Sequence, residues 1–183
     1  MQANSEKPTI KTPLRTLSLV NALYSIVDFE DMDGTPEVGE LRAASDEIDN
    51  IILKNGATAV GPLILNTWSG AGENGSSRFY AAYIRQTDSF ISGLEPPFRM
   101  EGSVYIPNCI YKYYEGEKSG LASVFFEAHM AANEEGGSLR GEAFTFLLSQ
   151  DLKAGTIAAE LYFPAILPAV TRPLSQGRGQ RLS

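Results

Sequence analysis

The pattern of apolar and polar residues along this chain predicts the same order of strands and helices twice. In the first half the pattern predicts a strand, a helix and two further strands, at residues 24–29, 37–55, 61–68 and 78–85. The second half repeats this order at residues 104–114, 119–132, 141–149 and 156–163. The strand segments are rich in aromatic and β-branched residues, and the helical segments carry apolar residues at steps of three and four. We therefore expect an α+β fold, a pseudo-symmetric duplication of a strand–helix–strand–strand module, with antiparallel sheets and two outer helices around a central cleft.

The first predicted helix has clear signals at both ends. Thr35 suits the N-cap, and Pro36 suits the first helical position because its missing N–H would be unpaired there. Leu41 and Ile48 belong to an apolar stripe at helical spacing, and Gly56 suits the C′ position that ends a helix. We expect this helix to lie on a sheet.

The second predicted helix begins near Ser119, its expected cap. Its inward stripe is expected to be Leu121, Val124, Phe125, Ala128 and Ala132. Phe126 and Met130 point away from that stripe. Either a loop or the tail covers them, or they form a contact with a protein partner or a homodimer interface, since contiguous exposed apolar surface usually has a use.

The two repeats are expected to form a single domain at residues 15–170, with one repeat at about 15–90 and the other at about 98–170. The segment 86–102 connects them, because its pair Pro96-Pro97 cannot donate hydrogen bonds to a strand ladder. Residues 1–14 are predicted to be a flexible leader, and residues 171–183, rich in Gly, Arg and Ser, a disordered tail.

Charge and composition narrow the function classes. The net charge of −7 argues against direct binding of nucleic acid, which depends on Lys and Arg neutralising phosphates. No apolar run approaches the roughly 20 residues needed to cross a bilayer, and the first 16 residues contain no apolar core of a secretion signal. The single Cys109 excludes a disulfide within the chain. We therefore expect a cytoplasmic protein with no membrane association.

Signatures of enzymes are largely missing. His129 is the one histidine, which excludes a His-rich metal site, and its position within a helix favours a structural role. Cys109 fits a small buried residue better than a nucleophile. The chain contains no GxSxG, HExxH or GxGxxG motif. We expect no metal site, no cofactor and no catalytic residue.

An acidic and aromatic group of residues remains as a candidate binding site. Glu160 and Tyr162 share one face of the last predicted strand because side chains alternate with a period of two. A carboxylate among Ala159 and Leu161 is unusual, since an unpaired buried charge is costly. Glu160 therefore either faces water or lines a cavity where a partner satisfies it. The aromatic residues that could surround the same cavity are Tyr111, Tyr83 and Trp68. Such walls with one carboxylate suit a small apolar or cationic molecule, although these aromatic residues could equally be ordinary core.

The second half resembles the GyrI-like domain, the effector-binding domain of bacterial transcription activators, which is related to the SOUL haem-binding fold. The resemblance rests on residues 111–116 (YKYYEG) before a helix and on residues 159–165 (AELYFPA) in the closing strand, where Glu160 matches a glutamate common in that family. It implies two strand–helix–strand–strand modules around a ligand cleft. The chain looks like a stand-alone group of uncharacterised GyrI-like proteins of Firmicutes type, some of which occur beside genes for secreted toxins.

Two departures from the family pattern qualify this resemblance. No helix-turn-helix pattern precedes the domain, so we do not expect the chain itself to be a DNA-binding activator. The usual Gly-Pro-Tyr is replaced by Glu115-Gly116-Glu117.

The leading hypothesis is non-enzymatic binding of a small apolar or cationic molecule between the repeats. The alternatives are an accessory or immunity-type protein-interaction factor with a vestigial cleft, and a small-molecule hydrolase that uses Glu160 as its general base.

Overall fold

The computed structural model describes residues 13–29, 38–71, 77–151 and 154–168. Most of the predicted leader, all of the predicted tail and the expected Thr35-Pro36 cap lie outside these ranges. Leu14, which was assigned to the leader, instead begins the first strand. This strand starts ten residues earlier than predicted because Leu17 and Leu19 are buried while Ser18 between them is exposed, which is the period-two pattern of a half-buried strand.

The first half consists of the four predicted elements. They are β1 (Leu14–Phe29), α1 (Val38–Lys54), β2 (Ala59–Ala71) and β3 (Ser77–Thr87). The bounds of α1 match the prediction within one residue at each end, and its Leu41, Ile48 and Ile52 are buried. Gly56, at φ of 72°, follows the helix in the left-handed conformation expected of a C′ residue.

The second half contains the predicted elements and two short additions. They are β4 (Phe98–Glu117), the 3-10 turn η2 (Lys118–Gly120), α2 (Leu121–Glu134), β5 (Ser138–Leu139), β6 (Glu142–Asp151) and β7 (Thr156–Ile166). The prediction that Ser119 caps α2 is wrong. Because η2 precedes the helix, Gly120 occupies the N-cap without a side-chain bond, and the hydroxyl of Ser119 bonds to Glu117 instead, at 3.4 Å. Neither helix, nor any other in the described ranges, has the length and apolar character of a membrane span.

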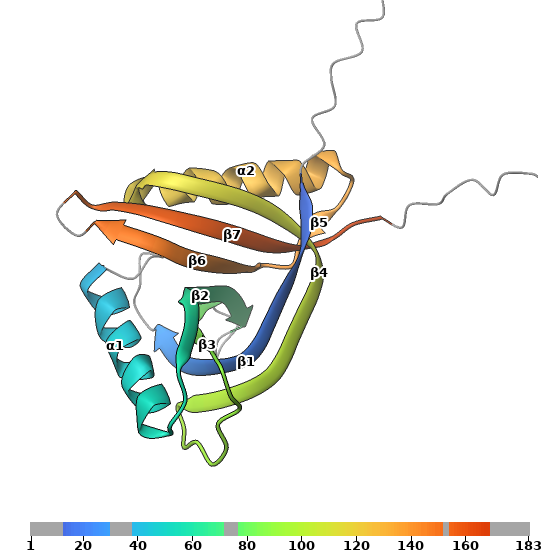
Figure 1. Cartoon of the computed structure of the whole chain (residues 1–183). Helices are drawn as coiled ribbons and strands as arrows, with labels where there is room; N and C mark the ends of the chain where they lie inside the picture. The colour runs from blue at the N-terminus through green and yellow to red at the C-terminus, as the bar shows by residue number, and fades with distance from the viewer. Residues whose placement is uncertain (1–12, 30–37, 72–76, 152–153, 169–183) are drawn as a thin grey trace, which may run out of the picture.

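The strands form one antiparallel sheet that closes on itself. Its order is β4-β1-β3-β2-β6-β7-β5, and a further pairing joins β4 to β7. The long strand β4 makes this possible because its first part pairs with β1, as at Leu19 and Val104, and its last part pairs with β7, as at Lys112 and Leu161. Figure 1 shows β4 running from the lower strands to the upper ones. In this ring β1, β2 and β3 of the first repeat correspond to β4, β6 and β7 of the second repeat. If each strand is exchanged for its counterpart, the same strands remain paired. The expected α+β fold is confirmed, and its duplication is visible in the pairing.

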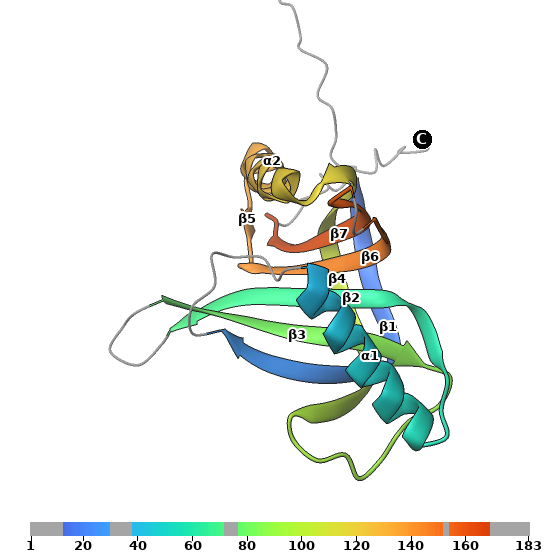
Figure 2. The ribbon, with the colours of Figure 1, turned by 90° about the vertical axis from the view of Figure 1, so that its left-hand side faces the viewer.

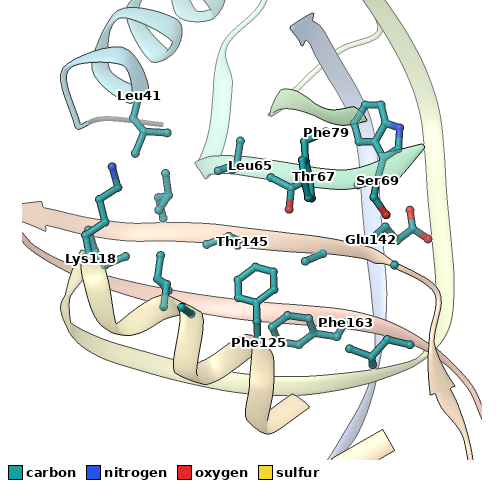
Figure 3. Close-up of a pocket in the computed structure, with 18 residues that line it drawn as sticks. Leu41, Leu65, Thr67, Ser69, Phe79, Lys118, Phe125, Glu142, Thr145 and Phe163 are labelled. Carbon is teal, nitrogen blue, oxygen red and sulfur yellow. The ribbon is translucent and has the colours of Figure 1, made fainter. Parts of the chain in front are cut away.

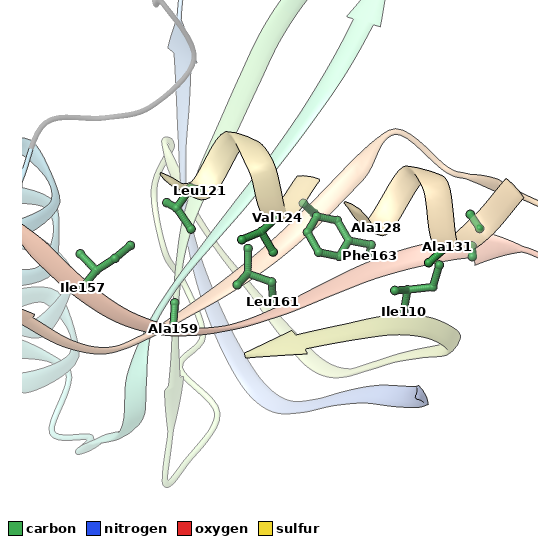
Figure 4. Close-up of a cluster of buried hydrophobic side chains, with 12 residues drawn as sticks. Ile110, Leu121, Val124, Ala128, Ala131, Ile157, Ala159, Leu161 and Phe163 are labelled. Atoms are coloured by element: carbon green, nitrogen blue, oxygen red, sulfur yellow. The ribbon is translucent and has the colours of Figure 1, made fainter. Parts of the chain in front are cut away.

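Three clusters of buried side chains hold this arrangement together. The inner cluster takes side chains from all six strands of the ring: Leu17, Ile64, Ile84, Cys109 and Phe144, with Tyr162 packed against them. The α1 cluster, which includes Ile48, Ile52, Leu65 and Tyr83, joins that helix to β2 and β3. The α2 cluster, which includes Ile110, Val124, Ala143, Leu161 and Phe163, joins the second helix to β4, β6 and β7 (Figure 4). Figure 2 shows α1 lying across β2 and β3. The helices therefore lie outside the ring, and a filled apolar core lies inside it.

Candidate functional site

A cavity of about 470 Å³ lies between the two helices, over strands β2 and β6. Its apolar walls come from α1, α2 and the strands beneath them: Leu41, Leu65, Leu121, Phe125, Leu147 and Phe163 (Figure 3). Small pockets of a few hundred Å³ with mainly apolar walls are typical of binding sites for organic molecules. This cavity is therefore the candidate site.

Small residues on the strands leave the space that the cavity occupies. Thr67 of β2 pairs with Ala143 of β6, and both line the cavity. Gly141, at φ of 84°, lines it beside Ser69, whose N–H donates to the carbonyl of Gly141 at 3.4 Å. Because these side chains are short, a space remains between the two helices and the strands β2 and β6.

Two phenylalanines form the wall on the α2 side. Phe163 of β7 is 1% exposed and belongs to the α2 cluster. The ring of Phe125 meets it edge-on, with centroids 5.0 Å apart at 82°. Phe125 itself is 37% exposed, so the prediction that it belongs to the buried stripe of the helix is wrong. Its position on the flank of α2 turns the ring towards the cavity rather than into the core.

The two charged residues of the described lining lie at opposite ends of this cavity. Lys118 of η2 lies at the end near Leu41, and Glu142 of β6 lies at the other end near Ser69 (Figure 3). Thr145 lies between them on β6. The described lining has no charged side chain in its central part.

Three of the five residues predicted as a site lie together, but elsewhere. The hydroxyl of Tyr111 donates to Oε1 of Glu160 at 3.0 Å, and the rings of Tyr111 and Tyr162 meet edge-on at 5.3 Å. The guanidinium of Arg15 lies over the ring of Tyr111, 3.4 Å from its centroid. Burial, followed by the bond to Glu160, raises the pKa of Tyr111. The chain thus supplies its own cation and hydroxyl to the aromatic and acidic group that was expected to receive a ligand.

The alternation along β7 separates this group from the cavity. Ile157 and Phe163 face α2 and line the cavity, whereas Glu160 and Tyr162 point to the opposite face of the strand. Glu160, Tyr162 and Tyr111 consequently do not line it.

The remaining two predicted residues also separate. Tyr83 is buried in the α1 cluster without lining the cavity. Trp68 borders the cavity, packs against the inner cluster and stacks on Tyr80 with centroids 5.7 Å apart. The five residues therefore do not form one site, because a strand presents successive side chains to opposite faces.

The residues that do line the cavity were missed for a simple reason. Phe125 and Phe163 were assigned to core and strand faces, and Thr67 and Thr145 carry no motif. The available signal was the run of short side chains at Gly141, Ala143 and Thr145 on one strand face, which leaves room beside a helix.

The two residues considered for chemistry have ordinary surroundings. His129 is exposed on α2, and no group of three or more His, Cys, Asp or Glu in the described ranges could hold a metal. Cys109 is fully buried, as predicted, and its thiol donates to the carbonyl of Ile106 at 3.4 Å. Burial raises the pKa of this thiol, which disfavours the reactive thiolate.

Comparison with known proteins adds evidence on the fold. No protein-family model matches the chain, and no curated protein matches it. The structure of the EcmrR C-terminal domain is similar, with a TM-score of 0.59 at 12% identity over 85% of this chain and 98% of that domain. The structure of the EcmrR–DNA complex in EcmrR-RPo also has a TM-score of 0.59, at 11% identity over 85% of this chain. This chain spans only 58% of the length of that EcmrR chain.

A third similar structure is an uncharacterized conserved protein from Listeria innocua. Its TM-score is 0.52 at 16% identity, over 85% of this chain and 93% of that protein. At such identities the likeness concerns the fold. The chain therefore has the fold that its resemblance to GyrI-like effector-binding domains implies.

Proposed function

We propose that this chain binds a small, largely apolar molecule in the cavity between α1 and α2, without chemical change to that molecule. The observation that carries the proposal is a cavity of about 470 Å³ whose walls are mainly apolar and include Phe79, Phe125 and Phe163. Aromatic rings favour both apolar compounds and lipophilic cations, through stacking and cation–π attraction. The resemblance of the chain to GyrI-like effector-binding domains, whose fold it has, is consistent with this role.

The tryptophan of the chain offers a direct test. Trp68 is the sole tryptophan and borders the cavity, so its fluorescence should change when the cavity fills. We expect N-phenylnaphthylamine, which is neutral, or tetraphenylphosphonium, which is cationic, to change this fluorescence in a saturable way. Phe125→Ala should weaken binding about 5- to 30-fold, since an aromatic contact of this kind is worth roughly 1–2 kcal/mol.

The neighbouring residue provides a matched control. Phe126 is 66% exposed and does not line the cavity, so Phe126→Ala should leave the affinity unchanged. Equal loss in both variants, or no response of Trp68 to either probe, would contradict the proposal.

Glu160→Gln tests the hypothesis that this carboxylate anchors a cation. We expect no loss of affinity, because Glu160 faces away from the cavity.

A second candidate function is interaction with a protein partner through α2. Phe126 and Met130 are 66% and 44% exposed, which is the outward position predicted from their spacing. Two large apolar side chains that lie one helical turn apart and are both exposed form a contact surface on this helix. The hydrolase alternative has less support, because Glu160 is bound to Tyr111 and does not border the cavity.

A further inference from the structure

We infer that the molecule bound in this cavity is neutral and carries hydroxyl or carbonyl groups along the edge that faces the sheet. The inference rests on the proposed binding function and adds the class of ligand. It depends on three features of the described lining: a row of hydroxyls on the strands, apolar side chains on the helices, and charges confined to the ends.

The hydroxyl row comes from the two strands at the seam between the repeats. Thr67 and Ser69 lie two residues apart on β2, so they point to the same face of the sheet. Thr145 of β6 pairs with Leu65, one alternating position from Thr67, and therefore lies diagonally across from it. All three line the cavity (Figure 3).

These hydroxyls have hydrogen-bonding capacity that the chain does not use. No hydrogen bond joins the side chain of Thr67, Ser69 or Thr145 to another residue in the described part of the chain. Thr145 is only 5% exposed, but no fully enclosed side-chain nitrogen or oxygen in the described ranges lacks a hydrogen-bond partner. The hydroxyl of Thr145, which has no partner in these ranges, must therefore be accessible. Because Thr145 lines the cavity, this hydroxyl opens into it. A ligand that brought purely apolar atoms against this row would leave the hydroxyls unpaired, at a cost in affinity.

The opposite wall of the cavity demands an apolar surface. Leu121, which is buried, and Phe125 line the cavity from α2, and Leu41 lines it from α1. The preferred molecule therefore has one polar edge against β2 and β6 and an apolar remainder beneath the helices.

The distribution of charge favours a neutral molecule over an ion. Lys118 and Glu142 are the charged residues of the described lining, and they lie at opposite ends. An ion held between them would lose its hydration without a counter-charge beside it.

A matched pair of probes tests the polar edge. Stilbene and trihydroxystilbene share one apolar framework, and only the second carries hydroxyls. We expect trihydroxystilbene to bind more tightly than stilbene, by calorimetry and by the response of Trp68. Thr145→Val keeps nearly the same shape without the hydroxyl and should reduce this preference about 3- to 10-fold, the usual range for one hydrogen bond, while leaving the affinity for stilbene nearly unchanged.

Controls separate this inference from the binding function itself. Thr156→Val removes a threonine hydroxyl from β7 away from the cavity and should leave the preference intact. Tetraphenylphosphonium and tetraphenylborate, which match in size and differ in sign, should both bind more weakly than trihydroxystilbene. If an ion binds most tightly, or if Thr145→Val leaves the preference unchanged, the inference is wrong while the binding function stands. If none of the probes binds, the proposed function fails and the inference fails with it.

Discussion

Burial inside the closed sheet changes the chemistry of Tyr24. This residue lies on β1, is 5% exposed and belongs to the inner cluster. The guanidinium of Arg99 lies over its ring, 4.7 Å from the centroid. Burial, with a smaller effect of the Glu101 carboxylate, raises the pKa of Tyr24 to about 12. The folded chain therefore holds this proton at pH values where an unfolded tyrosine, with a pKa of about 10, has lost it.

This difference predicts an alkaline loss of stability. Between pH 10 and 12 the unfolded state binds fewer protons at Tyr24 than the folded state, so the free energy of unfolding falls as the pH rises. The contribution of Tyr24 is fully present below pH 10. Tyr24→Phe, which cannot ionise, should show a shallower decline in urea midpoints measured from pH 8 to 11.5. Equal slopes for the variant and the parent chain would show that Tyr24 does not cause the decline.

The helix α2 presents different surfaces on its different sides. Leu121, Val124 and Ala128 are buried against the sheet. Phe125 lies on the flank that borders the cavity. On another side Glu127 receives Lys112 of β4 in an exposed ion pair at 3.1 Å, which contributes little to stability. The core does not use Phe126 and Met130, so these two side chains are free to serve an interface.

We expect the double variant Phe126→Ser, Met130→Gln to remain folded and to associate less. Substitutions at exposed positions usually change stability by only about 0.5 kcal/mol, so thermal unfolding should be nearly unaffected. Sedimentation should show a shift from dimer towards monomer, because burying each side chain at an interface is worth roughly 1.5–3 kcal/mol. Leu53→Ser on α1, at 74% exposure, serves as the control. A parent chain that is already monomeric, or a variant that unfolds, would contradict this prediction.

The two repeats depend on each other at the scale of the whole molecule. Pairings of β1 with β4 and of β2 with β6 join one repeat to the other along both sides of the ring. The inner cluster likewise takes side chains from both repeats. Neither repeat can lose its structure without exposing strand edges and core of the other, so we expect them to unfold together.

Leu161→Ala tests this coupling. Leu161 of β7 is fully buried in the α2 cluster of the second repeat, and such a truncation typically costs about 2–5 kcal/mol. The fluorescence of Trp68 in the first repeat and the far-ultraviolet circular dichroism of the whole chain should shift to the same lower denaturant midpoint. Phe90→Ala, at 56% exposure, should shift neither signal. A Trp68 transition that stays in place while the dichroism moves would show independent repeats.

Local periodicity was sufficient to predict the elements and their duplication. The apolar stripe marks α1 and Gly56 marks its C-terminal end, and the aromatic and β-branched segments mark the strands. The exposure of Phe126 and the burial of Cys109 were also predicted correctly from the local sequence pattern. These properties depend on residues a few positions apart, which the order of residues in the sequence specifies directly.

The site was decided by contacts between distant parts of the chain. The sequence marked Glu160 as unusual, but its partner Tyr111 lies 49 positions away, and Arg15 reaches the same group from β1. The period of two groups Glu160 with Tyr162 but does not say whether their face meets a helix, a cavity or the inside of a closed sheet. That choice depends on how β4 bends to pair with both β1 and β7, and on how the short side chains of Thr67 and Ala143 leave space between the strands and the two helices. Such distances are set by packing in three dimensions, so only the tertiary structure could place the cavity between α1 and α2.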